Sequence, residues 1–538
     1  MVVPSVTSSL KKYKGKWGRA EAKHLLKRTL FGAGKEDLDH FASKSLKHAI
    51  QQLLHTEEPA PAPPVNNYND EKYTDEEIQP GATWITATKL SGKNSGRRRN
   101  SFKAWWMGCM INQQRTLREK MVLFWHNHFA TEMNMVDNPF MIYKHNVLLR
   151  QYALGNFKAM VRAVTVDAAM LKYLNGNANT KKAPDENYGR ELQELFTVGK
   201  GPGSQYTEAD VKAAARVLTG FRINNKVLPG VHGIFDAGRH DESDKQFSAF
   251  YNNKVIKGRK GKEGESELDE LLDLIFQQPE VARFICRKLY RFFVYHQIDE
   301  DTERTIIEPL ARTFRENHYE IKPVLERLFS SRHFFDAGNR GGIIKSPVDF
   351  SVGLVREYKI PFPGEDSFVE QYGLWSNIQA TASQMQQNIG DPPNVAGWPA
   401  WYQEPLFDKS WISSDTLPKR TAFTDRMVTN GFARNGKKLL IDPVQYVKQL
   451  PAPGDPNKLI DDLAALLYAV DLPAEEKQYM KTGILLQGLQ GMASDHYWTD
   501  AWKKLQDKPD DAANTKNVTN KLKNLLKYMM SLPQYQLM

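Results

Sequence analysis

Cysteine is almost absent from the chain, since Cys109 and Cys286 are the only two among 538 residues. Neither thiol has a partner at metal-ligand spacing, which excludes a disulfide framework and a cysteine-rich zinc site. Each cysteine lies inside an apolar helical pattern, WWMGCMI for the first and ARFICRKLY for the second. We therefore expect two buried, unreactive thiols.

Long apolar runs are also missing. No stretch of about 18 consecutive apolar residues occurs, so no transmembrane segment is predicted and we expect a soluble chain. The N-terminal residues MVVPSVTSSLKKYKGK lack the uninterrupted apolar stretch of a secretory signal. A phosphate-cradling GxxxxGKS loop, a dinucleotide fingerprint and a G-x-S-x-G elbow are absent too. The sequence therefore gives no motif for these three kinds of chemistry.

The charge is moderately basic. Lys and Arg number 73 against 63 Asp and Glu, which gives a net charge of +10 and favours weak association with anionic partners. The excess is spread along the chain, apart from the dense cluster Arg97, Arg98 and Arg99. We interpret this cluster as a solvated, flexible face, and contact with a polyanion is the alternative. Taken as a whole, the sequence does not favour nucleic-acid binding.

Apolar spacing predicts the fold class. Hydrophobic residues make up 41% of the chain and recur mostly at intervals of three and four, which is the helical period. The length exceeds the roughly 250–300 residues that one hydrophobic core serves, so we expect two or more packed lobes. The prediction is a mainly α, large multi-helix globular fold with long irregular Pro/Gly/Trp-rich loops and at most minor β structure.

Changes in composition predict how the chain is organised. A capping-box pattern at Thr207 and Asp210 marks one helix start. FRINNKVLPGVHGIFD alternates apolar and polar residues, so the stretch around it is the best candidate for β structure or a long loop. The predicted regions are N-terminal helices at 1–54, an irregular or mobile connection at 55–100, a main helical core at 101–356 with a loop-rich insertion at 221–265, an aromatic and Pro-rich loop region at 357–424, and a C-terminal helical region at 425–538.

The string REKMVLFWHNHF carries the first candidate site. His126 and His128 are two residues apart, a spacing that does not share a helix face. They can bind one metal ion only if the helix ends there and the chain becomes extended, because alternate residues of an extended segment point the same way. The alternative is that one histidine caps the helix end and the other is buried in the core.

The string PDENYGRELQELF carries the second candidate site. Arg190 has Glu186 four residues before it and Glu194 four residues after it, which suits a salt-bridge ladder. Glu191 borders the core because it lies between apolar helical positions. The alternative to the ladder is a carboxylate cluster that ligates a metal or supplies a general base.

Two loop-rich strings give weaker candidates. His240 and Asp241 stand together in GRHDESDKQF, and loops often carry chemistry. The string GDPPNVAGWPAW offers Asn394, Trp398 and Trp401 as a platform for a ligand, with tight loop packing as the alternative.

Seven ordered segments resemble the signatures of one bacterial family. They are HLLKRTLFGAG, KMVLFWHNHFAT, ALGNFKAMV, PDENYGRELQELFTVG, YTEADVKAAARVLTGF, HDESDKQF and DPPNVAGWPAW, spread over roughly residues 19–420. The family is a domain of unknown function, number eighteen hundred in its series. The resemblance singles out as signature positions His24, His126, His128, Glu186, Asn187, Arg190, Glu191, Glu194, His240, Asp241, Asn394, Gly397 and Trp398.

What the resemblance implies about function is modest. No activity carries over from the family. Its members are often exported, which implies an exported or periplasmic location, although this chain shows no signal peptide. Their genes often neighbour those of a sulfatase-like family, which implies a sulfatase-like companion as a partner.

Two hypotheses follow for the function. In the first, the chain is a hydrolase-like enzyme in which a divalent Zn, Mn or Fe ion activates water. Its predicted metal ligands are His126, His128 and Glu186, and its predicted catalytic residues are Glu191, Glu194, Arg190, His240 and Asp241. In the second, the chain is a non-catalytic binding or assembly protein that holds a polysaccharide or protein partner.

Overall fold

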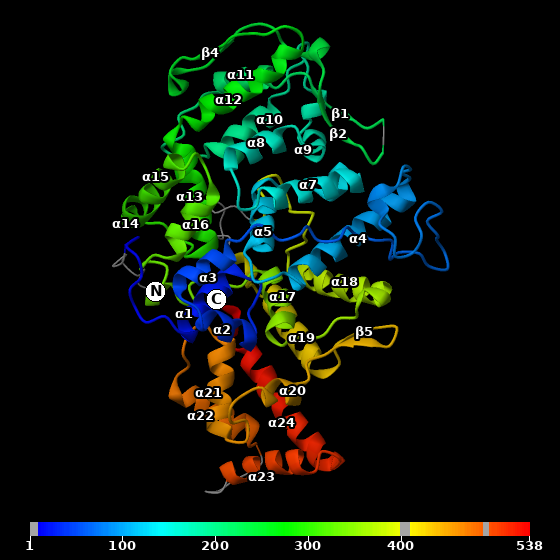
Figure 1. Cartoon of the computed structure of the whole chain (residues 1–538), viewed down its shortest axis with the longest axis vertical. Coiled ribbons are helices and arrows are strands. Elements are labelled where there is room, and N and C mark those ends of the chain that lie inside the picture. The colour runs from blue at the N-terminus through cyan, green and yellow to red at the C-terminus, as the bar shows by residue number, and fades with distance from the viewer. Residues whose placement is uncertain (1–8, 227, 399–408, 488–493) are drawn as a thin grey trace. The chain divides into compact units, whose positions relative to one another are not determined.

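Helices dominate the structure, a computed structural model that describes residues 9–226, 228–398, 409–487 and 494–538 (Figure 1). Strands in these ranges form three two-stranded antiparallel sheets, so the predicted mainly α fold with minor β structure is confirmed. Among the described residues, none of the helices combines the length and the apolar character that crossing a bilayer requires.

The chain divides into two compact units, and each takes segments from distant parts of the sequence. Unit 1 comprises Met1–Lys14, Leu46–Phe334 and Asn388–Leu406. Unit 2 comprises Gly15–Ser45, Phe335–Gln387 and Phe407–Met538.

Unit 1 contains most of the helices and two of the sheets. Its helices are α3 (Leu46–Leu53), α4 (Gly92–Ile111), α5 (Arg118–His128), α6 (Met133–Val136), α7 (Pro139–Gln151), α8 (Phe157–Thr165), α9 (Ala168–Tyr173), α10 (Glu186–Glu191), α11 (Glu208–Val217), α12 (Glu267–Phe276), α13 (Pro279–Phe293), α14 (Glu300–Thr302), α15 (Glu308–Glu316) and α16 (Ile321–Phe329). Its strands are β1 (Phe221–Asn224), β2 (His232–Phe235), β3 (Lys245–Gln246) and β4 (Val255–Ile256). All four strands lie in the stretch predicted as β structure or loop.

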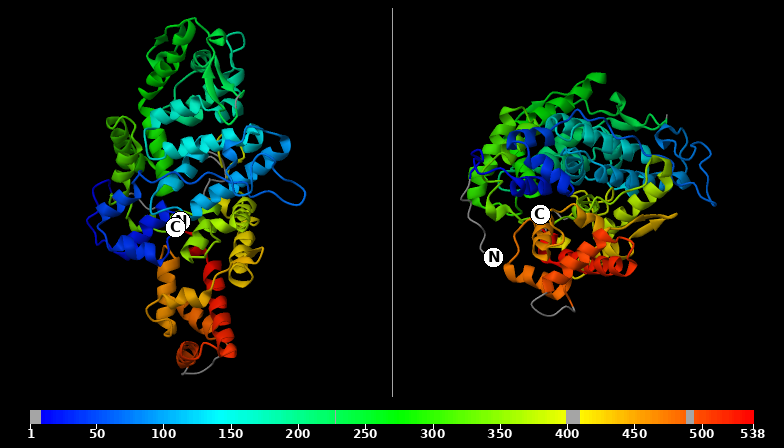
Figure 2. Two further views of the ribbon diagram at one scale, coloured as in Figure 1. Left: turned by 45° about the vertical axis from the view of Figure 1, so that its right-hand side comes forward. Right: turned by 60° about the horizontal axis from the view of Figure 1, so that its bottom comes forward.

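Unit 2 joins two N-terminal helices to the C-terminal part of the chain. Its elements are α1 (Arg19–Thr29), α2 (Lys35–Ala42), α17 (Pro347–Glu357), α18 (Phe368–Gln384), α19 (Thr416–Thr429), α20 (Pro443–Lys448), α21 (Pro456–Leu467), α22 (Ala474–Tyr479), α23 (Ser494–Asp507), α24 (Ala512–Ser531), β5 (Phe432–Arg434) and β6 (Lys437–Leu439). Within this unit α17 packs on α18, and α19 packs on the long C-terminal α24 (Figure 2).

The core of unit 1 forms around α5, a helix that is buried almost all round. Trp125 stacks on Phe157 with ring centroids 5.5 Å apart, and its indole N–H donates to the carbonyl of Ala153 at 2.9 Å. A helix that is covered on every side must carry apolar residues on every side, and this explains the continuous string KMVLFW. Any polar side chain on α5 therefore needs a partner inside the protein.

Local sequence signals set several helix starts. The Thr207 hydroxyl accepts from the N–H of Asp210, and the Asp210 carboxylate accepts from the N–H of Thr207, so the predicted capping box is confirmed. Asn138 caps α7, which begins with Pro139 at a position where a missing N–H costs nothing.

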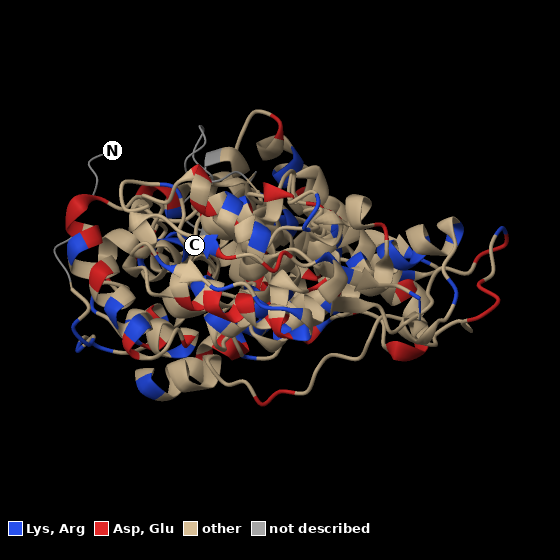
Figure 3. Ribbon diagram, turned by 90° about the horizontal axis from the view of Figure 1, so that it is seen from above, with Lys and Arg blue, Asp and Glu red and all other residues tan. Residues whose placement is uncertain are grey.

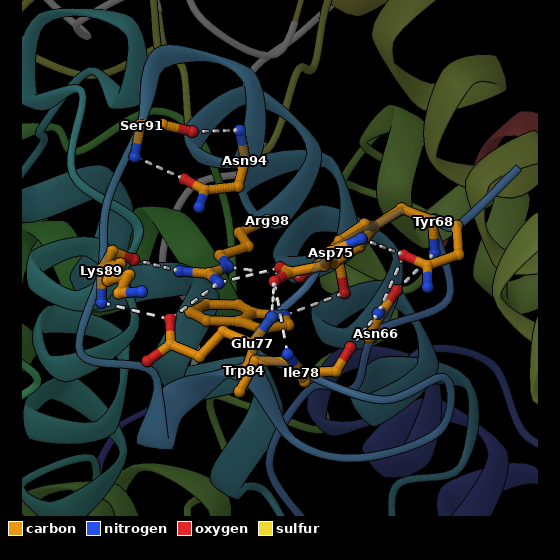
Figure 4. A network of polar contacts seen from close by, with 12 residues as sticks. Asn66, Tyr68, Asp75, Glu77, Ile78, Trp84, Lys89, Ser91, Asn94 and Arg98 are labelled. Atoms are coloured by element: carbon orange, nitrogen blue, oxygen red, sulfur yellow. Dashed lines mark hydrogen bonds and ion pairs between the residues drawn. The ribbon is translucent and has the colours of Figure 1, made fainter. Parts of the chain in front are cut away.

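The basic cluster at residues 97–99 lies inside helix α4, so our interpretation of it as a flexible, solvated face was wrong. Arg98 is fully buried, and its guanidinium pairs with Asp75 at 2.8 Å. It also donates to the Tyr68 hydroxyl at 3.2 Å and to the carbonyl of Lys89 at 2.9 Å (Figure 4). The irregular segment before α4 is thus held onto the helix by a buried ion pair. Elsewhere, charges of both signs are interspersed along the chain (Figure 3).

The predicted loop region 357–424 contains a long helix, α18. Tyr372, Trp375 and Ile378 are buried at helical spacing along it. Prolines on both sides of this stretch suggested a loop, but they lie outside the helix and only bound it.

Candidate functional site

Glu191 is the last residue of α10, where the helix changes its winding. The next turn, Leu192–Thr197, is π-helical, a rare geometry that often occurs at functional sites. Gly189 fixes where α10 lies, because a Cβ there would come within 3.0 Å of the backbone nitrogen of Ala215 on α11. The close packing of α10 on α11 therefore determines where Glu191 points.

The carboxyl group of Glu191 is half-buried and lacks a complete set of partners. Its Oε2 is buried and makes no hydrogen bond. Burial raises the pKa of Glu191 to about 7, and repulsion from Glu194 adds to this effect. Lys200 and Arg190 act in the opposite direction without reversing the shift. At neutral pH the group therefore exists in both protonation states.

A second carboxyl group, that of Glu194, and the phenol of Tyr173 interact electrostatically with Glu191. The Tyr173 hydroxyl donates to Glu132 Oε1 at 2.8 Å, and the pKa of Tyr173 is raised by burial, by Glu132 and by Glu191. Glu194 forms an ion pair with Lys200. The carboxyl of Glu191 therefore lies beside the ion-paired carboxylate of Glu194 and the hydrogen-bonded phenol of Tyr173.

Arg190 belongs to a surface ladder that differs from the predicted one. It pairs with Glu186 at 3.2 Å, as expected, but its other partner is Glu208, which accepts from both terminal nitrogens at 2.7 Å. Glu194 therefore takes no part in the ladder. Glu186 and Arg190 are about one third exposed, so they hold α10 to α11 at the surface.

His128 forms a hydrogen bond to the π-helical turn. Its Nε2–H donates to the carbonyl of Phe196 at 3.0 Å, and its Nδ1 accepts from the Lys288 ammonium at 2.8 Å. Burial lowers the pKa of His128 well below its ordinary value and that of Lys288 to about 7. Both ring nitrogens are thus engaged, and we infer that His128 positions the turn after Glu191.

His126 and Asn127 hold the 388–398 loop. The Nε2 of His126 accepts from the N–H of Gly390 at 3.1 Å, and Asn127 Oδ1 accepts from the N–H of Trp398 at 2.8 Å. The His126 ring meets the Trp398 ring edge to face, with centroids 5.7 Å apart. Burial lowers the pKa of His126 to about 3, so this imidazole stays neutral. The sequence motif around His126 and the sequence motif around Trp398 are therefore in contact with each other.

Gly397 makes this contact possible, and replacing it tests the contact. Its φ is +89°, and a Cβ there would overlap Asn127. Gly397→Ala is expected to lower the free energy of unfolding by about 2–5 kcal/mol, because backbone strain and overlap add. Gly96→Ala is the control, since Gly96 lies in α4 with open space around it and gains up to about 1 kcal/mol from helix propensity. Equal melting temperatures for the two variants would contradict the contact between Asn127 and the 388–398 loop.

Of the predicted platform, the structure describes Asn394 and Trp398, and only Asn394 is exposed to solvent. Trp398 is only 2% exposed and covers His126, which favours the loop-packing alternative. Asn394 is exposed, and its Oδ1 accepts from the N–H of Ala396 at 2.9 Å within the loop. Trp401 lies outside the described residues.

His240 and Asp241 are adjacent in sequence but contact different partners. His240 is buried, with Nε2 3.1 Å from Glu267 and Nδ1 2.9 Å from the carbonyl of Thr219. Asp241 accepts from Arg216 Nε at 2.7 Å. Although burial acts to raise it, bonds from Arg216 and Ser243 hold the pKa of Asp241 below its ordinary value. These contacts fix the 240s loop and form no acid–base dyad.

The predicted metal ligands do not gather. In the ranges that the structure covers, no group of three or more His, Cys, Asp or Glu side chains is arranged to hold a metal ion. His126 contacts Gly390, His128 contacts Phe196 and Lys288, and Glu186 contacts Arg190. The expectation that His126 and His128 face one point is wrong, because the helix continues through both residues and turns their rings to different neighbours.

Sequence reasoning missed Glu132, Tyr173 and Lys200. Each stands alone in its own string, and no short spacing links it to Glu191. In the structure Tyr173 and Lys200 interact electrostatically with Glu191, and Glu132 accepts the hydrogen bond of Tyr173.

Comparison with known proteins places the chain in a family. No curated protein and no solved structure matches it. One family model matches residues 24–537, a longer stretch than the segments that first indicated the resemblance. The chain therefore belongs to the family described as protein of unknown function, DUF1800.

Proposed function

We propose that the chain is a hydrolase-like enzyme that uses the Glu191 carboxyl as its general acid. The observation that carries the proposal is the buried Oε2 of Glu191, which has no hydrogen-bond partner although it lies beside a second glutamate. A buried polar atom without a partner costs free energy, and such costs are commonly retained where a substrate supplies the partner.

The reaction follows from the two carboxyl groups. Protonated Glu191 donates its proton to the leaving oxygen of a bound ester or glycosidic bond as the carbon–oxygen bond breaks. A water molecule adds to the carbon, and its proton passes to the Glu194 carboxylate, which forms an ion pair with Lys200. Solvent then carries that proton back to Glu191, so one water is consumed and two hydroxyl-bearing products leave. In this proposal Tyr173, whose hydroxyl donates to Glu132, orients the substrate.

This proposal departs from the metal-assisted version. That version required His126 and His128 to converge, and their ring nitrogens are engaged by Gly390, Phe196 and Lys288. The partner-binding alternative relied on a Trp-rich loop and a basic surface, and in the described part of that loop Trp398 is buried. The free carboxyl of Glu191 supports acid–base chemistry without either feature.

The pH dependence of hydrolysis tests the proposal. Chromogenic nitrophenyl esters, glycosides, phosphates and sulfates are incubated with the protein from pH 5 to 9. One class is expected to be cleaved, and above pH 7 its rate should fall by roughly tenfold per pH unit, because the acid form of Glu191 is lost as the pH passes its pKa of about 7. No cleavage of any class, or a rate that keeps rising to pH 9, would contradict the acid role and leave the partner-binding hypothesis.

A further inference from the structure

A pocket in unit 1 is lined by residues that do not include Glu191, Glu194 or Tyr173. Its volume is about 450 Å³, within the range of roughly 300–1,000 Å³ that small-molecule sites occupy. Helix α9 contributes Lys172, and the β1–β2 hairpin and the turn after it contribute Arg222 and Arg239. Asn177 and Asn225 add amide groups to the same wall.

The cations of this pocket exceed the charges that neutralise them. Arg222 pairs with Asp236 at 2.7 Å, and Arg239 lies 3.7 Å from the same carboxylate, so two guanidinium groups share one negative charge. Lys172 is exposed and has no ion-pair partner within the described residues. The Coulomb energy of the site is therefore favourable for an added anion.

The one carboxylate that lines the pocket is already engaged. Asp137 lies 3.2 Å from the Arg99 guanidinium, and its Oδ1 accepts from the Ser95 hydroxyl at 3.4 Å. When Arg99 and Asp236 are counted with the three lining cations and Asp137, two positive charges remain in excess. Asp137 therefore does not cancel the attraction for an anion.

We propose that this pocket binds a tetrahedral oxyanion group, a phosphate or sulfate ester, on a small ligand. Two guanidinium groups and one ammonium approach from separate elements, which suits three or more oxygens around one centre better than the two coplanar oxygens of a carboxylate. The side-chain amides of Asn177 and Asn225 can donate to further oxygens. The proposal does not depend on the role of Glu191.

Calorimetric titration tests the proposal on the full chain at constant ionic strength. The probes are glucose 6-phosphate, glucose 6-sulfate and gluconate, with sodium chloride as the blank. At least one of the two esters is expected to bind about tenfold more tightly than gluconate, and the tighter ester identifies which oxyanion the pocket prefers. Equal binding of all three probes, or no binding by either ester, overturns the assignment.

Two variants show whether binding takes place in this pocket. Lys172→Ala and Arg239→Ala should each weaken ester binding by about tenfold or more, because each removes a charge-assisted contact. Lys254→Ala removes the same charge from an exposed site between β3 and β4 and should leave binding unchanged. Lys172 is exposed, so its variant is expected to fold, and unchanged circular dichroism verifies this. An equal loss of ester affinity in Lys254→Ala would show that binding reflects the general charge of the protein, and would refute binding in this pocket.

Discussion

Glu191→Gln is expected to lower kcat/KM for the cleaved substrate by about 100-fold or more. The amide keeps the shape of the side chain but cannot donate or accept the transferred proton, and general acid–base groups contribute about 10²–10⁴-fold. The measurement is the rate of chromophore release at pH 6.5, with the substrate that the wild-type protein cleaves best.

Glu186→Gln is the matched control for this variant. It changes a glutamate on the same helix that is paired with Arg190 at the surface, so its rate should stay within about twofold of the wild-type rate. If both variants lose activity equally, the loss reflects damage to α10 and the role of Glu191 is refuted.

The stability of Glu191→Gln provides a second, independent consequence. Because folding raises the pKa of Glu191, the folded state holds a proton that the unfolded state releases between about pH 4.5 and 7. Its stabilising contribution is complete below the ordinary glutamate pKa and is lost as the pH rises through about 7. Glutamine has no charge to bury, so the variant should match the wild type near pH 4 and exceed it at pH 8 by about 1–2 kcal/mol, because solvent screens part of the effect at this partly exposed side chain.

Arg98→Ala is expected to lower the free energy of unfolding of unit 1 by about 3–5 kcal/mol, which is the range for breaking a buried ion pair. The substitution leaves the Asp75 carboxylate buried without its cation and removes a donor from Lys89 and Tyr68. The segment before α4 should detach, so limited proteolysis at residues 62–91 should become faster.

Arg97→Ala is the control for that experiment. Arg97 neighbours Arg98 in sequence, but its ion pair with Asp70 is partly exposed, at 32% and 52% for the two side chains. Exposed pairs contribute roughly 0–1 kcal/mol, so this variant should melt close to the wild type. A similar loss in both variants would contradict the distinct role of the buried pair.

The contrast between these two arginines shows what the sequence can predict. The RRR cluster carries no mark that one of its members is buried, because its partners Asp75 and Tyr68 lie in a segment without regular periodicity. The capping box of α11 was predictable because Thr207 and Asp210 are three residues apart and satisfy each other locally. Signals that act within one helical turn can be read from the sequence, and contacts across the fold cannot.

The candidate site follows the same rule. Helical spacing placed Glu191 beside the core, and the structure places it there with one buried, partnerless oxygen. The same spacing predicted Glu194 as a partner of Arg190, but the π-helical turn changes the register, and Glu194 pairs with Lys200 instead. His126 was predicted to bind metal from its spacing to His128, and nothing in its own string reveals that Gly390 contacts its ring.

The central claim is that Glu191 holds a proton near neutral pH, and a carboxyl ¹³C NMR titration tests it most directly. The spectrum of protein labelled at glutamate Cδ is recorded from pH 4 to 9 and compared with that of Glu191→Gln, so that the one missing signal identifies Glu191. This signal should titrate with a midpoint of about 7, because burial and Glu194 disfavour the carboxylate. A midpoint near 4.5, the ordinary value for glutamate, would contradict the account and with it the acid–base function.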